Sequence, residues 1–235
     1  MPELAVLVPT RGRPDNIRKV ISAWHVTNAC GVADLVLVID ADDSEIQGYR
    51  DLVDPDAIPL RLIEVPVWMP MVHKLNLAAL MEAEVGQYFA LGFAGDDHIP
   101  QTMNWAQRYL AVLHELKTGM VYGDDGYQGQ DLSTEWAVTS DVVRALGRMV
   151  PAPVEHVYCD NSIMELFGDA GALRHLPEVR IEHMHPIAGK AGNDDQYRRV
   201  NSSDQFRRDR QAYAAWAQND KAAQVKLIQE LRARP

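Results

Sequence analysis

Short apolar runs alternate with longer amphipathic stretches through the first half of the chain. The apolar runs are rich in Val, Leu and Ile, and they predict β-strands over residues 4–8, 35–39, 60–65 and 88–92. The stretches between them predict helices over residues 15–29, 44–53 and 71–84. Strands and helices that alternate at this spacing predict an α/β fold, with a parallel sheet flanked by helices. Such sheets bind ligands at the carboxyl ends of their strands.

The second half of the chain is less regular. A helix is predicted over residues 101–117, and two short strands follow around a glycine-rich acidic turn, over residues 120–122 and 135–138. The remaining pattern predicts a helix, a strand, a connector and a long terminal helix, over residues 161–172, 179–184, 189–195 and 205–233. No internal repeat interrupts this order, so we expect one domain.

Composition supports one compact domain. The 235 residues are 47% hydrophobic and 24% charged, which suits a substantial core. The longest apolar runs are far shorter than the roughly 20 residues that cross a bilayer, so we expect no membrane span. Two cysteines do not imply a disulfide framework, and they fit a reducing compartment. We therefore expect a soluble, cytoplasmic protein.

The net charge of −10 argues against a general nucleic-acid-binding surface. The average hides a local concentration of arginine, the basic island, which consists of Arg198, Arg199, Arg207, Arg208 and Arg210 against Asp204 and Asp209. A solvated helix start with mixed charges is the simplest explanation of this segment. A surface that guides a phosphate backbone is the alternative.

The first candidate site follows the first predicted strand. Pro9, Thr10, Arg11 and Arg13 form a turn before a helix whose start is indicated by Pro14. Backbone N–H groups at a helix start, with arginines beside them, suit a diphosphate. The segment is neither a P-loop nor a dinucleotide fingerprint. An ordinary strand-to-helix turn with solvated arginines therefore stays open.

Acidic side chains end the second predicted strand. Asp40, Asp42 and Asp43 lie so close together that their charges repel, which costs stability unless a ligand or cation uses them. Asp43 or Ser44 can cap the next helix, which explains one carboxylate without a ligand. Asp40 is then left to accept a hydrogen bond from a base N–H or a sugar hydroxyl.

Two further groups indicate a metal site. Asp96, Asp97 and His98 follow the fourth predicted strand and offer ligands suited to Mn²⁺ or Mg²⁺. A turn rich in aspartate before a helix is the alternative. His183 and His185 are two residues apart on a predicted strand, so both imidazoles would lie on one face of it, where they could contact a metal or a phosphate. A structural role for these histidines is the alternative.

The order and spacing of these motifs resemble glycosyltransferase family 2 and related enzymes of the GT-A fold, of a short bacterial or phage type. The resemblance covers residues 4–195. It implies a Rossmann-like mixed sheet flanked by helices, followed by a long C-terminal helix. Within a single domain, 1–235, it divides the chain into a nucleotide-binding half (1–100), an acceptor and metal half (101–195) and a C-terminal helical extension (196–235).

The resemblance also implies roles for individual residues. In the donor site, it assigns the nucleoside and diphosphate contacts to Pro9, Thr10, Arg11, Arg13, Asp40, Asp42, Lys74, Asn76 and Asp96. Asp40 would bind the base, and Lys74 and Asn76 would face the phosphates and the sugar. The metal ligands would be chosen from Asp96, Asp97, His98, His183 and His185. One departure stands out, because Ala94 occupies the place of the upstream acid of an Asp-x-Asp motif.

The implied activity is transfer of a sugar from a nucleoside diphosphate, UDP first, to an acceptor hydroxyl with a divalent metal ion. Asp160, at a predicted helix start, corresponds to the general base, which implies inversion at the anomeric carbon. A helix N-cap is the alternative for Asp160. The acceptor is open between a modified base in phage DNA, a glycan, a lipid-linked sugar and a protein; a phage enzyme would act in the host cytoplasm. Nucleotidyl transfer and nucleotide-sugar binding without turnover are the rival functions.

Overall fold

The computed structural model describes residues 2–54, 60–184 and 202–234. Within these residues, eight strands form a mixed sheet in the order β3-β2-β1-β4-β7-β6-β8-β5. In chain order the strands are β1 (Leu4–Pro9), β2 (Ala33–Asp40), β3 (Leu60–Val65), β4 (Ala90–Phe93), β5 (His98–Pro100), β6 (Met120–Asp124), β7 (Trp136–Thr139) and β8 (Leu173–His183).

The N-terminal half of the sheet is parallel and its other half is mixed. β1 pairs in parallel with β2 and β4, and β2 pairs in parallel with β3. β7 is antiparallel to β4 and β6, whereas β8 runs parallel to β6 and antiparallel to β5. Every residue of β1 and of β2 is buried, as expected for parallel strands with both faces covered. The predicted mixed α/β architecture is thus confirmed.

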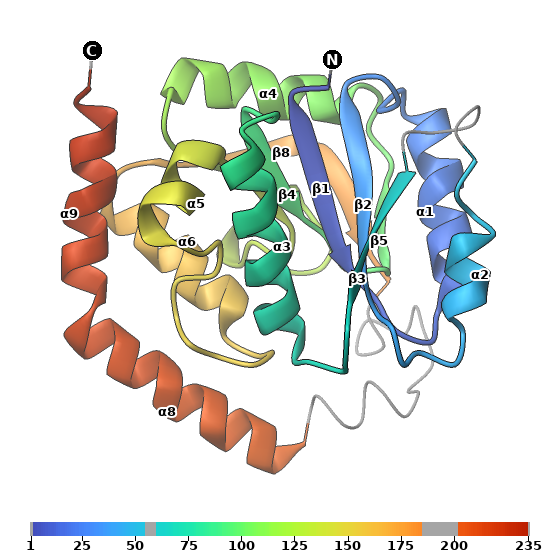
Figure 1. Ribbon diagram of the computed structural model, residues 1–235. Helices are drawn as coiled ribbons and strands as arrows, with labels where there is room; N and C mark the ends of the chain where they lie inside the picture. The colour runs from blue at the N-terminus through green and yellow to red at the C-terminus, as the bar shows by residue number, and fades with distance from the viewer. Residues whose placement is uncertain (1, 55–59, 185–201, 235) are drawn as a thin grey trace.

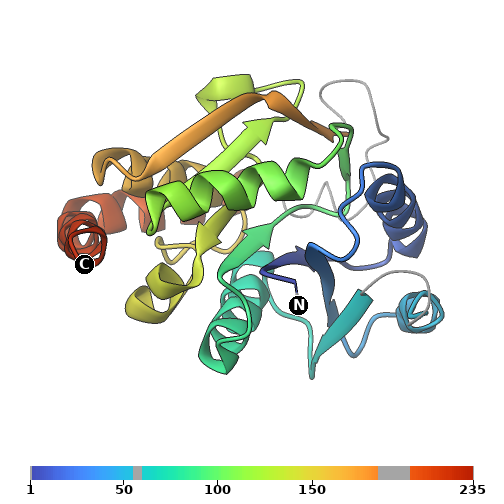
Figure 2. The same ribbon diagram turned by 90° about the horizontal axis from the view of Figure 1, so that it is seen from above.

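Helices cover both faces of the sheet (Figures 1 and 2). In chain order they are α1 (Pro14–Val26), α2 (Ile46–Arg50), α3 (Met71–Val85), α4 (Trp105–Leu116), the 3-10 helix η1 (Gly129–Asp131), α5 (Ser140–Leu146), α6 (Cys159–Asp169), α8 (Ser203–Asn219) and α9 (Lys221–Arg232). Because strand side chains alternate between faces, two cores result. One packs Trp24 and Trp105 of α1 and α4 against the sheet, and the other packs Leu75 and Trp216 of α3 and α8.

The structure differs from the sequence-based expectation in the second half. Strand β5 and helix α5 were not predicted, because three and seven residues are too short for a periodic signal. Strand β8 begins at Leu173, six residues before the predicted start, because Pro177 suggests an interruption. The proline lies where the register of β8 against β6 shifts, between Tyr122 and Asp124, and such irregularities accommodate proline in a sheet.

The predicted long terminal helix is two helices. Asp220, with φ −113°, separates α8 from α9. Lys221 then forms ion pairs with Glu165 and Asp169, both on α6, which fastens the junction to the domain. Within the described part of the chain, no helix has both the length and the apolar character needed to cross a membrane.

Candidate active site

The loop after β1 and the turn after β4 meet at the carboxyl ends of the parallel strands. Thr10 Oγ1 donates to Asp96 Oδ2 at 2.7 Å, and Arg13 Nη1 lies 3.1 Å from Asp96 Oδ1. Asp96 is buried, and burial raises its pKa, as does the charge of Asp97, while Arg13 and Thr10 oppose the rise. The structure therefore brings together the first and third predicted motifs around one carboxylate.

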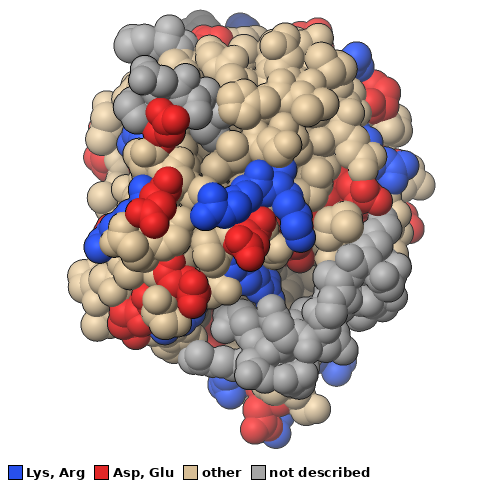
Figure 3. Space-filling view, turned by 90° about the vertical axis from the view of Figure 1, so that its right-hand side faces the viewer, with Lys and Arg blue, Asp and Glu red and all other residues tan. Residues whose placement is uncertain are grey.

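Asp40 lies at the centre of a second charged group. Its side chain is fully buried, and Oδ2 lies 2.9 Å from Lys74 Nζ and 3.2 Å from Arg11 Nη1. Met69 N donates to Oδ1 at 3.3 Å. Arg11 also contacts Asp42 at 2.7 Å, near the surface. Two cations thus share one buried carboxylate. Figure 3, which looks onto the side of α1 and α2, shows basic side chains gathered around acidic ones near the centre of that face.

The backbone of the loop after β1 is held by α2 and the turn before it. Gly12 N donates to Asp43 Oδ2 at 2.8 Å, and Arg13 N donates to the Tyr49 hydroxyl at 2.7 Å. Asp43 Oδ1 also accepts from Glu45 N, so this carboxylate shapes a turn, and Glu45 takes the N-cap position of α2. These two loop amides are therefore bonded within the protein. A diphosphate at this loop would depend on the arginine side chains more than on these amides.

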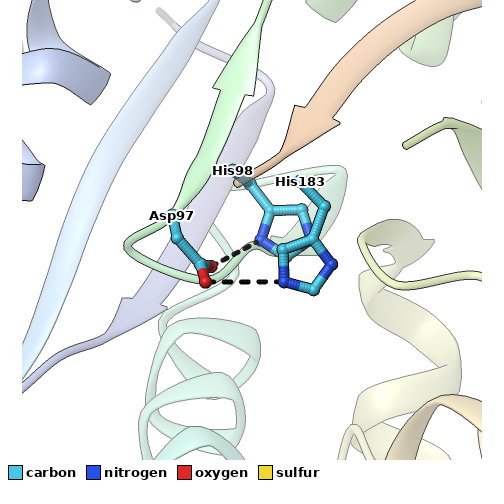
Figure 4. A group of neighbouring side chains, drawn as sticks. All are labelled: Asp97, His98 and His183. Carbon is cyan, nitrogen blue, oxygen red and sulfur yellow. Dashed lines mark ion pairs between the residues drawn. The ribbon is translucent and has the colours of Figure 1, made fainter. Parts of the chain in front are cut away.

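Asp97, His98 and His183 converge at the ends of β5 and β8 (Figure 4). The antiparallel register pairs His98 with His183, and their rings stack with centroids 4.1 Å apart. Asp97 Oδ1 lies 3.3 Å from His98 Nδ1, and Oδ2 lies 3.5 Å from His183 Nε2. Burial by itself would raise the pKa of Asp97, but the two imidazoles outweigh it and hold that pKa well below its usual range.

This Asp–His group is the one set of metal-ligating side chains found in the described part of the chain. One ligand atom from each residue lies within 4.8 Å of the others. A carboxylate and two imidazoles suit Mn²⁺. Asp96 is not part of the group, because its oxygens face Thr10 and Arg13. His185 lies outside the described residues.

Asp125 contacts the Asp–His group through Thr134 and the backbone of His183. Sequence analysis missed this residue. Its Oδ1 accepts three backbone N–H groups of the following turn, which lowers its pKa against the raising effect of burial. Its Oδ2 accepts from Thr134 Oγ1 at 3.0 Å, and Thr134 Oγ1 lies 3.4 Å from His98 Nε2. The Asp125 carbonyl accepts from His183 N at 2.9 Å. Partners of this kind orient metal-binding imidazoles.

Asp160 is the second residue of α6 and lies near the Asp–His group. Burial raises the pKa of Asp160 to about 6, and the negative charge of Asp125 adds to the rise. The Cys159 thiol, which donates a hydrogen bond at 3.1 Å, and the charge of His183 lower that pKa. The charges of His183 and Asp125 act on Asp160 because these groups are close together. The N-cap residue of α6 is Tyr158, so Asp160 is not the N-cap.

Solved structures of similar fold span almost the whole chain. Staphylococcus aureus TarS matches with 11% identity and a TM-score of 0.61, over 98% of this chain and 43% of that one. The mannosyltransferase PcManGT from Pyrobaculum calidifontis, solved with GDP-Man and Mn²⁺, matches with 13% identity and a TM-score of 0.59, over 98% and 74%. A Desulfovibrio desulfuricans protein assigned as a nucleotide-diphospho-sugar transferase matches with 14% identity and a TM-score of 0.51, over 97% and 99%.

The chain has the GT-A fold of nucleotide-sugar glycosyltransferases. It spans less than half of the length of the TarS chain that it matches. No protein-family model matches the sequence, and neither does any curated protein. The likeness in structure therefore establishes the fold, and the activity has to be argued from the site.

The structure shows which parts of the protein Asn76 and Ala94 contact. Asn76 holds the segment between α5 and α6, since its Oδ1 accepts from Met149 N at 2.9 Å and Val150 N at 2.8 Å. It is therefore not brought into the charged group around Asp40. Ala94, at the place of the upstream acid, packs against the apolar core between α1, α4 and the sheet.

His156 is a further residue that sequence analysis missed. It lies four residues before Asp160, and its Nδ1 is buried with no hydrogen-bond partner. Burial lowers the pKa of His156 to about 4, while Asp209 and Asp97 raise it and Arg13 lowers it. The imidazole is thus neutral at physiological pH, and it lies close enough to Asp97 and Arg13 for their charges to act on it. Nothing in the local sequence pattern indicates this position.

Proposed function

We propose that the chain is a metal-dependent glycosyltransferase that moves a sugar from a nucleoside diphosphate to an acceptor hydroxyl. The observation that carries the proposal is the position of Asp160, whose pKa is about 6, beside the Asp97–His98–His183 group in a GT-A fold. A carboxyl group with a pKa near neutrality suits a general base, and the ligand set suits a divalent cation.

The residues present fit a Mn²⁺ ion better than Mg²⁺, because two of the three ligands are imidazoles and Mg²⁺ prefers oxygen. Asp97, His98 and His183 would hold it, because their ligand atoms are already within 4.8 Å of one another and small side-chain rotations can direct them at one ion. When bound, such an ion neutralises charge on the leaving diphosphate. His185 stays a proposed fourth ligand. Asp96 would support the site by orienting Thr10 and Arg13.

The donor would lie along the carboxyl ends of β1, β2 and β4. Arg11, Arg13 and Lys74 are paired with Asp40, Asp42 and Asp96 in this structure, and the phosphates of a donor would compete for the same cations. Asp40 would bind the base, and Pro9 and Thr10 would line the nucleoside. UDP is the first candidate nucleotide, and structures of TarS with UDP and with UDP-GlcNAc support that order.

Asp160 would take the proton of the acceptor hydroxyl as the hydroxyl attacks the anomeric carbon. Attack from the side opposite the leaving diphosphate inverts the configuration there.

The acceptor could be a modified base in DNA, a glycan or a protein. The basic island offers little charge for binding a DNA backbone, because two of its arginines face carboxylates. Arg207 pairs with Asp204 at 3.0 Å, and Arg208 lies 3.5 Å from Glu155. Arg198 and Arg199 lie outside the described residues. A glycan or protein acceptor is therefore ranked first.

The test is a donor and acceptor screen with product analysis. The protein is incubated with UDP-glucose, UDP-GlcNAc or GDP-mannose and Mn²⁺, with and without EDTA, against glycans, peptides and hydroxymethylated DNA at low salt. We expect release of the nucleoside diphosphate together with a glycosylated acceptor, and loss of both with EDTA. Release of pyrophosphate would instead indicate nucleotidyl transfer. Donor binding without turnover on any acceptor would indicate a binding protein.

A further inference from the structure

The segment that leads into α6 is held by one carboxylate from the C-terminal helix α8. Asp209 Oδ1 accepts from Glu155 N at 2.9 Å, and Oδ2 accepts from His156 N at 3.0 Å and Val157 N at 2.9 Å. Gln205 Nε2 donates to Oδ2 at 2.9 Å from one turn earlier on α8. Four N–H donors thus converge on a side chain that is 1% exposed.

These bonds require a carboxylate. Consecutive backbone N–H groups that point at one spot form an anion-binding concavity, and here the anion is supplied by a helix more than 50 residues further along the chain. The bonding partners of Asp209 in the described residues are N–H donors alone, so its charge is stabilised chiefly by amide dipoles. Without it, three backbone donors would lose their partner in a part-buried loop, which carries a desolvation cost.

The held segment ends in a strained residue. Tyr158 has φ +66°, in the left-handed region that a bulky side chain rarely adopts. Such strain persists only where the surroundings enforce it. Helix α8 holds this turn through two contacts. Asp209 binds the preceding backbone N–H groups, and the Tyr213 ring stacks on the Tyr158 ring with centroids 5.3 Å apart. Asp160 follows two residues later, so the conformation of this turn determines where its carboxylate lies.

We propose that Asp209 is a positioning residue for the transfer reaction, holding residues 155–157 so that Asp160 and His156 face the donor and the Asp–His group. The inference rests on the proposed function for its effect on rate. It gives helix α8 a role in the reaction through the loop that Asp209 holds. Asp209 acts through Asp160, which is the catalytic residue.

The test compares Asp209→Asn and Asp209→Ala with Asp204→Asn, a control on the exposed first turn of the same helix. We expect kcat to fall about 10²-fold in Asp209→Ala and less in Asp209→Asn, which keeps one acceptor oxygen, because small displacements of a reacting group cost that much. The KM for the donor and the affinity for UDP should stay within about twofold of the parent, since Arg11, Arg13 and Lys74 are untouched. Asp204→Asn should match the parent throughout.

A second readout needs no turnover. Amide hydrogen exchange of residues 155–160 should be at least about tenfold faster in Asp209→Asn than in the parent, with the central strands unchanged. If Asp209→Ala does not fold, the milder Gln205→Ala, which removes one of the four donors, should show the same effects at smaller size. Unchanged exchange, or a parental kcat with exchange accelerated, would overturn the inference. A parent that transfers no sugar would refute the proposed function instead, and the exchange data would still decide whether Asp209 holds the loop.

Discussion

Asp160 is where the environment of a single residue has the clearest consequence for chemistry. Burial raises its pKa to about 6. The Cys159 thiol and His183 lower that pKa, and Asp125 raises it. A carboxyl group of ordinary pKa would be a weaker base, and one far above neutrality would be protonated at physiological pH. A base in the intermediate range suits proton removal from a hydroxyl.

The rate of transfer should therefore depend on pH through Asp160. If Asp160 is the general base, as proposed, its carboxylate is the active form, so kcat should rise with pH and be lost as the pH falls through about 6. Asp160→Asn keeps the size and the hydrogen bond from Cys159 but cannot take a proton, and it should lower kcat by roughly 10²–10⁴-fold. Its UDP affinity and melting temperature should stay near the parental values. Parental turnover in this variant would mean that the base is another group.

The Asp–His group makes a prediction about metal binding. His183→Ala removes one of the imidazoles beside Asp97, so UDP should no longer bind more tightly in Mn²⁺ than in EDTA. Calorimetry with and without Mn²⁺ measures this directly. His114→Ala is the control, because that side chain is 47% exposed and lies on α4. Equal metal dependence in both variants and the parent would remove His183 from the site.

At the scale of elements, polar side chains fasten helices to the loops of the second half. Asn76 on α3 holds residues 149–150, and Asp209 on α8 holds residues 155–157. Both contacts lie within the connection between α5 and α6, one near each end. That connection has little regular structure of its own, and these helices define its path to Asp160.

Asn76 offers a test that separates holding a loop from binding a ligand. Asn76→Ala leaves two backbone N–H groups without their acceptor and should lower the free energy of unfolding by about 1–3 kcal/mol. Urea denaturation measures the loss, and calorimetry should give parental affinity for UDP and UDP-GlcNAc. Gln47→Ala, at an exposed bond to Asp51, should change neither. Weaker UDP-GlcNAc binding at parental stability would instead support the sugar contact implied by the resemblance.

For the whole molecule, buried ionisable groups connect stability to pH. Glu135 lies inside the core, where it accepts from the Tyr109 hydroxyl at 2.6 Å and Gly123 N at 2.8 Å, and burial raises its pKa to about 7. His156 has the opposite behaviour, because burial lowers its pKa to about 4. Glu135 therefore favours the folded state at low pH, and His156 favours it at higher pH. Their effects on the pH dependence of stability partly cancel between pH 4.5 and 6.5.

Replacing Glu135 separates the two contributions. The folded protein holds the Glu135 proton more tightly than the unfolded chain, so this stabilisation is full below pH 4.5 and is lost as the pH rises through about 7. The stability of the parent relative to Glu135→Gln should therefore fall by on the order of 3 kcal/mol across that range. Denaturation at several pH values measures the trend, and Glu115→Gln, at an exposed site on α4, should show none. A flat difference would mean that folding does not raise the pKa of Glu135.

The sequence by itself determined much of the N-terminal half. Strands β1 to β4 and the helices between them follow from local periodicity, because apolar alternation and helix spacing are properties of neighbouring residues. Parallel topology then puts Thr10, Asp40 and Asp96 at one edge of the sheet, and these side chains do lie together there. The GT-A fold was implied by the family resemblance that these motifs carry.

Tertiary structure alone decided the partners of those side chains. Pairing of β5 with β8 stacks His98 on His183. The packing of α8 puts Asp209 in hydrogen-bonding contact with backbone N–H groups more than 50 positions earlier. Such contacts depend on the register and packing of distant segments, about which local periodicity carries no information. The same holds for the pKa of Asp160, because burial is a property of everything that surrounds a residue, and the chain brings that together only when it folds.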